Sequence, residues 1–326
     1  MSPDPILVER FRNDLAALVP AGTPLGIAVS GGADSLALLL LAHAAASGRV
    51  EAATVDHGLR EESADEARLV ATVCDRLGIP HAILTADWTE KPQSALQERA
   101  RDERYRRLGS WMDERGLDAL ATAHHADDQA ETLLMRLGRG SGLQGLAAIR
   151  ALSVVPGSTK ALVRPLLGWA SADLKQICAA AGLDPVDDPS NHDDRFERVR
   201  VRRFLATSDL LLPERLARSA ACLGDAEDAL AWAMEAHWRE CVEEAAGAIA
   251  YRPCGAPAEI VRRVVARAIL ILASEGQSVD LRGGEIDRIV AALTRGGTAT
   301  LRGVLCVGGD AWRFSRAPAR QPRLER

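Results

Sequence analysis

The chain has 326 residues and a formal net charge of −5, so it is long enough for about two domains and lacks the global basic charge of many nucleic-acid-binding proteins. Its six cysteines form no C-x-x-C pair, which argues against a zinc ribbon, an iron–sulfur site and a disulfide framework. The sequence shows no cationic leader and no apolar run long enough to span a membrane, so we expect a cytoplasmic protein that does not act at a membrane.

The first half of the chain alternates short apolar segments with helical patterns. Strands are predicted at 26–29, 52–55, 82–85, 119–121 and 161–163. Two capping boxes, Ser63 with Glu66 and Ser94 with Gln97, indicate helix starts between them. Strands separated by such helices pair in parallel and present ligands at their carboxyl ends. The sequence therefore predicts an α/β domain with a Rossmann-like parallel sheet over residues 1–205.

A glycine-rich turn directly follows the first predicted strand and precedes the apolar run 36–41. Backbone N–H groups at a helix start lack intrahelical acceptors and attract anions, and glycine allows close approach to a phosphate. A carboxylate here, Asp34, would repel a polyphosphate unless a divalent cation lay between them. We therefore predict a site for ATP with Mg²⁺ at Ser30, Gly31, Gly32, Ala33, Asp34 and Ser35. The lysine and spacing of a Walker loop are missing, and the alternative is a plain turn of small residues.

The second predicted strand ends at Asp56 and His57. A Rossmann-like sheet presents residues to a nucleotide from this position. We assign both residues to nucleotide binding, although a structural role for His57 is equally open.

A cluster of histidines and acids, His-His-Ala-Asp-Asp-Gln-Ala-Glu-Thr at 124–132, follows the fourth predicted strand. If a helix begins near Asp127, part of this cluster points toward the ligand edge of the sheet. One interpretation is a dedicated metal site of His and Asp ligands. We favour Mg²⁺ held jointly by Asp34, Asp128 and ATP phosphates. Acids at a helix N-terminus are favourable anyway, but that alternative leaves the paired histidines unexplained.

The segment Gly140 to Gly145 matches the dinucleotide pattern G-x-G-x-x-G. It follows a helix rather than a strand, and no acid stands about twenty residues further on. We interpret it as a mobile glycine-rich loop near the active site.

Two arginine clusters differ in their neighbours. Acids interleave the arginines of 99–107, which predicts a solvated face with salt bridges. Within 195–203 Glu197 is the single acid, so we predict contact with phosphate or an RNA backbone there.

The remainder of the chain, 206–326, reads as a second, mostly helical domain that ends in a small hairpin. Helices are predicted at 213–244, 257–273 and 284–293, and the hairpin at 298–307 and 311–315. We expect Trp232, Trp238 and Trp312 to pack inside this domain rather than to stack on bases.

Taken together, these residues resemble the tRNA(Ile)-lysidine synthetases, which belong to the PP-loop superfamily of N-type ATP pyrophosphatases. The resemblance is collinear over residues 26 to about 205. Its segments are SGGADS at 30–35, VDHGLR at 55–60, ARDERY at 100–105, HHADDQAET at 124–132, RLGRGSGLQGL at 136–146, RPLL at 164–167 and DPSN at 188–191. Where the family shows Arg-Asn-x-Ile/Val-Arg after DPSN, Val199 replaces the expected asparagine.

The resemblance implies an ATP-dependent ligase that attaches free lysine to carbon 2 of the wobble cytidine in a tRNA(Ile) with the anticodon CAU. ATP would adenylate the oxygen on that carbon, and the lysine amine would then displace AMP. The implied catalytic residues are Asp34, His124, Asp128 and Arg202. Those implied for lysine or tRNA are Asp127, Glu131, Arg164, Arg198 and Arg200. The resemblance also implies tRNA recognition by the second domain, and a homodimer is the default oligomer.

Three alternatives remain at this stage. A tRNA thiolation enzyme would activate the same kind of carbonyl but generally needs paired reactive cysteines. An amidating ligase acting on a small molecule would share SGGADS alone, and a non-catalytic tRNA-binding relic would keep the fold without the reaction. The roles of His57 and His125 and the exclusion of an initiator tRNA with the same anticodon do not follow from the sequence.

Overall fold

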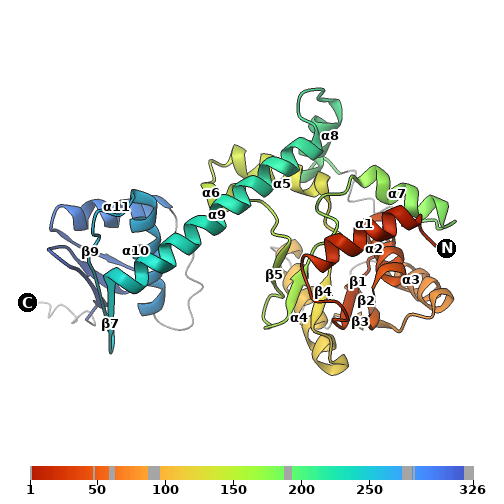
Figure 1. Cartoon of the computed structure of the whole chain (residues 1–326), viewed down its shortest axis with the longest axis horizontal. Helices are drawn as coiled ribbons and strands as arrows, with labels where there is room; N and C mark the ends of the chain where they lie inside the picture. The colour runs from red at the N-terminus through yellow and green to blue at the C-terminus, as the bar shows by residue number, and fades with distance from the viewer. Residues whose placement is uncertain are drawn as a thin grey trace, which may run out of the picture. The chain divides into compact units, whose positions relative to one another are not determined.

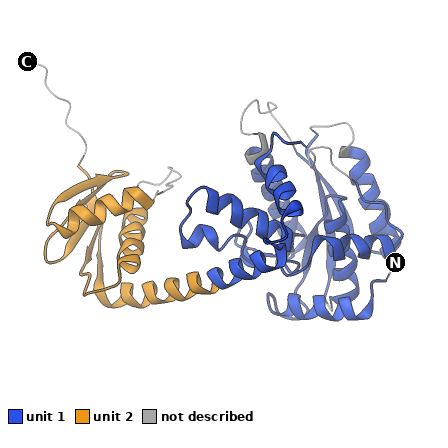
Figure 2. Cartoon of the chain, turned by 90° about the horizontal axis from the view of Figure 1, so that it is seen from above, with its two compact units in different colours: residues 1–224 blue, residues 225–326 orange. Residues whose placement is uncertain are grey.

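The computed structural model describes residues 2–46, 48–58, 63–86, 96–186, 193–273, 281 and 283–318. The chain divides into two compact units, Met1–Gly224 and Asp225–Arg326, coloured separately in Figure 2. This division falls inside helix α9 (Pro213–Cys241), beyond the boundary at residue 205 predicted from the sequence. No helix in the described ranges is long and apolar enough to cross a membrane.

Unit 1 contains a six-stranded sheet with the strand order β3-β2-β1-β4-β6-β5. The strands are β1 (Leu25–Ala28), β2 (Val50–Asp56), β3 (His81–Thr85), β4 (Ala119–Ala121), β5 (Leu152–Val154) and β6 (Ala161–Val163). All neighbours pair in parallel except β5, which is antiparallel to β6. The predicted parallel α/β sheet is confirmed. The sequence did not predict β5, a short edge strand that exposes Leu152 and Val154.

Helices cover both faces of this sheet. They are α1 (Pro5–Ala16), α2 (Ala33–Ala45), α3 (Ser63–Leu77), α4 (Leu96–Arg115), α5 (Ala126–Gly138), α6 (Leu143–Leu146), α7 (Ser171–Ala180) and α8 (Glu197–Thr207). Helices α1 and α7 pack on α2, which is buried along most of its length (Figure 1). Side chains alternate across β4, with Ala121 in the core beneath α2 and Leu120 in a second core with α4.

Gly26 allows β1 and α4 to pack closely. A Cβ atom at this position would lie 2.8 Å from the Trp111 ring. We expect Gly26→Ala to lower the free energy of unfolding by about 1–3 kcal/mol because the core is overpacked, as measured by urea denaturation. A Cβ at Gly168 would meet nothing within 4 Å, so Gly168→Ala is the control. Equal stability of the two variants would contradict this expectation.

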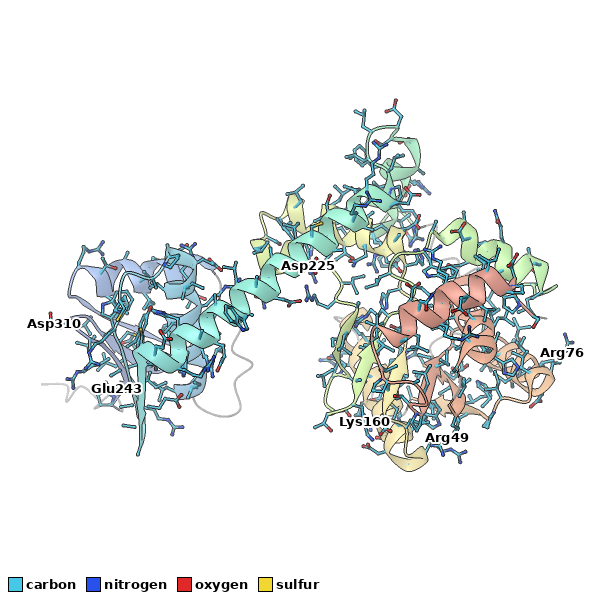
Figure 3. The ribbon with its side chains drawn as sticks, viewed as in Figure 1. Arg49, Arg76, Lys160, Asp225, Glu243 and Asp310 are labelled. Carbon is cyan, nitrogen blue, oxygen red and sulfur yellow. The ribbon has the colours of Figure 1, made fainter. Side chains whose placement is uncertain are left out.

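The strand order reverses between β1 and β4. The chain proceeds from β1 outward to β2 and β3, then returns to add β4 on the other side of β1. In open parallel sheets, ligands bind outside the carboxyl ends of the strands at such a reversal. The turn at 30–35 and the cluster at 124–132 follow β1 and β4, so both lie there. Arg49 and Lys160, which precede β2 and β6, lie at the opposite end of the sheet (Figure 3).

Unit 2 is more strand-rich than predicted. Its sheet has the order β7-β8-β11-β10-β9 and is antiparallel throughout. The strands are β7 (Val242–Ala245), β8 (Ala248–Tyr251), β9 (Thr298–Leu301), β10 (Val304–Val307) and β11 (Trp312–Arg316), and the further helices are α10 (Ala258–Leu272) and α11 (Gly283–Thr294). The sequence missed β7 and β8, and the segment predicted as one strand at 298–307 turns at Arg302, which has φ +49°.

A core between the unit 2 sheet and helices α10 and α11 holds Trp238 and Trp312, as expected. The expectation is wrong for Trp232, which is 74% exposed. Its neighbours Leu230, Ala233 and Met234 on α9 pack against the unit 2 core, so Trp232 lies on another face of the same part of the helix.

Several sequence features lie outside the described residues. These are Leu59 and Arg60 of the VDHGLR segment, the DPSN segment at 188–191 and the side chains of the capping boxes at Ser63, Ser94 and Gln97.

Candidate active site

The glycine-rich turn is held by its own two serines. Ser35 Oγ accepts the backbone N–H of Ser30 at 3.1 Å and donates to the Gly32 carbonyl at 2.9 Å. Gly31 has φ +87°, a conformation that favours glycine. Gly32 begins α2 without a side-chain cap, so backbone N–H groups at this helix start are available to an anion.

His125 lies between three carboxylates. Its side chain is nearly buried, with Nε2 at 3.4 Å from Asp34 Oδ2 and 3.6 Å from Asp128 Oδ2, and Nδ1 at 3.3 Å from Asp127 Oδ2. Burial lowers the pKa of this imidazole, but the carboxylates outweigh it and raise the pKa to about 10. His125 is therefore a cation that holds the acids of β4–α5 next to Asp34.

His124 lies in the same region as His125, but its pKa is shifted in the opposite direction. Burial lowers the pKa of His124 to about 4, although Asp128 opposes the shift. Its Nδ1 lies 3.0 Å from Thr122 Oγ1. The imidazole is therefore neutral near pH 7.

Glu131 anchors two arginines of α8. It is 1% exposed. Its Oε1 accepts Arg202 Nε–H at 2.6 Å, and its Oε2 forms an ion pair with Arg198 Nε at 3.0 Å. Arg198 also donates to Thr132 Oγ1 at 3.0 Å. Val199, the departure from the family pattern, is buried on α8.

One cavity of about 680 Å³ joins these features, a volume within the usual range for small-molecule sites. Its charged and polar lining residues are Ser30, Asp34, Ser35, Thr54, His57, Glu66, Arg104, Thr122, His124, His125, Asp128, Arg198 and Arg202. A glycine-rich helix start, two carboxylates outside the strand ends and three arginines can together hold a polyphosphate and its counter-ion.

Comparison with known proteins identifies the family. Residues 7–208 match the PP-loop domain family. The chain is 49% identical to the tRNA(Ile)-lysidine synthase of Novosphingobium aromaticivorans, with 95% of this chain and 94% of that protein covered. It is 42% identical to the tRNA(Ile)-lysidine synthase of Zymomonas mobilis, with 93% and 91% covered. The chain belongs to the tRNA(Ile)-lysidine synthase family. The family resemblance inferred from the sequence is thereby confirmed.

A solved structure with the same fold as unit 1 is more distant. The U34-tRNA thiolase NcsA from Methanococcus maripaludis, described with its [4Fe-4S] cluster, matches at 17% identity with a TM-score of 0.53, covering 66% of this chain and 76% of that chain. At 17% identity, the similarity between NcsA and this chain concerns the fold alone.

Some residues that the sequence analysis assigned to the site lie outside the cavity lining. Asp127 accepts the backbone N–H of Ser171 at 2.9 Å and so caps α7. Arg164 is buried and donates to the Arg150 carbonyl and to Ser153. Asp56 accepts the Gly58 N–H, and Arg200 donates to two backbone carbonyls. Gly31, Ala33 and Glu131 also lie beside the cavity rather than in its lining. Roles for these residues in binding stay predictions.

The glycine-rich segment at 140–145 includes the start of the short helix α6 and does not line the cavity. Arg136 donates to the carbonyls of Gly145 and Ala148. The side-chain amide of Gln129 both donates to and accepts from the backbone of Ile149. These contacts attach the segment to α5.

Arg104 is the main cavity residue that sequence reasoning missed. The prediction of a solvated, salt-bridged face holds for Arg106. Arg107 also donates to Glu103 but is half-buried, and the prediction is wrong for Arg104. This residue lines the cavity, with its guanidinium 5.1 Å from the Tyr105 ring centroid, and burial lowers its pKa. No described carboxylate forms an ion pair with it. The available signal was its place in the ARDERY segment.

We expect Arg104→Gln to lower kcat/KM for ATP by about 10- to 100-fold, because a hydrogen bond to a charged group is lost in a partly buried site. Steady-state pyrophosphate release measures this effect. Arg106→Gln, an exposed residue paired with Glu103, is the control. Equal activity of the two variants would remove Arg104 from the site.

The acids of the cavity fit Mg²⁺ shared with a ligand. Asp34 and Asp128 offer carboxylate oxygens, which this ion prefers, and Mg²⁺ in phosphate sites is usually held by one or two carboxylates plus the phosphates. Within the described ranges no group of three or more His, Cys, Asp or Glu side chains could hold a metal ion alone. A metal at this site would therefore depend on the bound phosphates.

Proposed function

We propose that this protein ligates free lysine to carbon 2 of the wobble cytidine in a tRNA(Ile) with the anticodon CAU, using ATP and releasing AMP and pyrophosphate. The observation that carries the proposal is the convergence on one cavity of the glycine-rich turn, the acids Asp34 and Asp128, and the arginines of α8. The names and coverage of the curated relatives support it.

In the first step the oxygen on carbon 2 attacks the α-phosphorus of ATP, the bond to pyrophosphate breaks, and the base oxygen becomes part of a good leaving group. The N–H groups at the start of α2 bind phosphate oxygens, and Arg104, Arg198 and Arg202 balance the charge that develops on them. Asp34 and Asp128 would hold Mg²⁺ together with the phosphates, and the ion would supply positive charge to neutralise them.

In the second step the lysine amine attacks carbon 2, the bond to the adenylate oxygen breaks, and AMP leaves. The carboxylates of the cavity attract the cationic amino acid. The attacking amine must lose a proton, and the neutral imidazole of His124 accepts it at Nε2 while Nδ1 contacts Thr122. The cytidine must enter unstacked, which a single-stranded anticodon loop permits at low cost.

We assign tRNA recognition to the domain at 206–326, and we keep a homodimer as the default oligomer. Analytical ultracentrifugation with and without tRNA tests the oligomeric state, and a monomer under both conditions would contradict a dimer.

Thiolation is the second candidate, because NcsA shares the fold of unit 1. Such chemistry generally uses reactive cysteines near the activated base. In the described part of the chain no cysteine lines the cavity, and burial raises the pKa of the nearby Cys178 thiol to about 11. Lysine ligation is therefore the better-supported function.

The deciding experiment incubates the full chain with ATP, Mg²⁺, labelled lysine and total tRNA, followed by digestion to nucleosides and mass spectrometry. We expect a lysine adduct of cytidine and pyrophosphate release that requires tRNA. Release without a lysine adduct would favour thiolation or another base modification. No release with any tRNA would favour the non-catalytic relic.

A further inference from the structure

A second cavity lies between α5 and α8, outside the site already described. Its volume is about 420 Å³, and it is lined by Leu134, Leu137, Val201 and Phe204 together with Glu197 and Arg200. It shares no lining residue with the first cavity. The volume lies in the range of small-molecule sites.

The walls of this cavity are apolar and unusually exposed. Leu137 is 57% exposed and Phe204 is 56% exposed. An exposed aromatic ring facing aliphatic side chains across a groove suits a flat, apolar group that can stack on the ring.

The positive charge of α8 and of the residues just before it favours an anionic partner. Residues 193–207 contain five arginines and three acids. All of these arginines except Arg200 form ion pairs, with Asp193, Asp194 or Glu131. Glu197 is neutralised by an ion pair with Arg139. Arg200 donates to the carbonyls of Asp194 at 2.8 Å and Arg195 at 3.3 Å, and no described carboxylate pairs with it. A partner that combines flat rings with an anionic backbone is single-stranded nucleic acid.

Helix α8 also places the two cavities next to each other. Arg198 and Arg202 line the first cavity, while Arg200 and Phe204 line the second. Residues two apart on a helix point to nearly opposite sides, about 10–12 Å across including side chains. A strand that delivers one base to the first cavity can therefore place another base of the same loop in the second.

We propose that the second cavity binds an unpaired base of the anticodon loop close to the reacting cytidine, with Phe204 stacked on the base and Arg200 on the backbone phosphate. The proposal rests on the proposed function, since it assumes that RNA is the substrate.

The test measures binding of an anticodon stem-loop RNA with a CAU anticodon to the full chain by fluorescence anisotropy, without ATP or lysine. We expect Phe204→Leu to weaken binding by about 5- to 100-fold, because leucine keeps the apolar wall but removes base stacking. Phe204→Trp should bind like the wild type. Leu210→Ala is the control, since Leu210 is 80% exposed but lies outside the cavity. Thermal melts verify that all variants fold.

Abasic substitutions in the RNA loop identify the bound base. At one loop position, the abasic RNA should bind the wild-type protein about as weakly as the intact RNA binds Phe204→Leu. Combining that abasic RNA with Phe204→Leu should weaken binding little more than either change alone. Wild-type affinity in Phe204→Leu, or additive losses at every loop position, would overturn the base-binding cavity and leave the proposed function intact. A change in self-association with unchanged RNA affinity would show instead a contact between copies. Absence of RNA binding by the wild type would overturn the proposed function itself.

Discussion

Replacing Asp128 with asparagine is expected to lower the rate of pyrophosphate release by at least about 10²- to 10³-fold, the usual cost of removing one group that stabilises charge in a transition state. Asparagine has nearly the same shape, and its amide oxygen can still accept the backbone N–H of His125, which Asp128 Oδ2 accepts at 3.1 Å. The start of α5 should therefore persist, while the negative charge facing Asp34 and the cavity is lost. The measurement is pyrophosphate release with ATP, lysine and tRNA transcript.

Asp118→Asn is the matched control for this variant. Asp118 directly precedes β4 and so lies at the end of that strand opposite to the cavity, where it is exposed and 3.6 Å from Lys160 Nζ. We expect full activity and nearly unchanged stability. If Asp128→Asn keeps more than half of the wild-type rate, Asp128 is not a working carboxylate of the site.

Local sequence was sufficient to place the elements that carry this site. The strands at 119–121 and 161–163 have the bounds predicted for them. Their apolar runs are short, buried and bounded by polar turns, so the pattern depends on neighbouring residues alone. The turn at 30–35 was equally visible, because a strand, glycines and a helix start follow one another directly.

Contacts between distant residues were not predictable in the same way. The role of His125 stayed open because its charge depends on Asp34, which lies 91 positions earlier in the chain but 3.4 Å away in space. Arg104 was assigned to a solvated face, since alternating charges do not reveal which side of a helix meets a cavity. In unit 2 the strand β7 overlaps the end of the helix predicted at 213–244. The pairing of β7 with β8, and of β8 with the distant strand β11, identifies both strands.

The ion pairs of the buried Glu131 carboxylate are a further feature that the neighbouring sequence does not predict. Its sequence spacing indicated a helix face, but its partners Arg198 and Arg202 lie on α8, up to 71 residues away. Because both arginines line the cavity, Glu131 acts as a positioning residue for two cations. The charge balance of the cavity thus depends on a side chain that does not line it.

We expect Glu131→Gln to lower both stability and activity. Glutamine can accept a hydrogen bond but cannot neutralise two guanidinium groups, so the free energy of unfolding should fall by about 1–3 kcal/mol; the half-exposed arginines keep the loss in this range. Loosened arginines should slow pyrophosphate release by up to about 10²-fold. Urea denaturation and pyrophosphate release at saturating substrates measure the two effects.

A double-mutant cycle with Arg202→Gln separates anchoring from a general loss of stability. The two changes should show a coupling energy of about 0.5–3 kcal/mol, because the ion pair is already lost in either single variant. Glu227→Gln is the matched control, since Glu227 is also mostly buried and pairs with an arginine, Arg263, in unit 2. It should lower stability while leaving pyrophosphate release at saturating tRNA unchanged. If Glu131→Gln behaves in the same way, Glu131 only stabilises the fold, and the two arginines keep their positions without it.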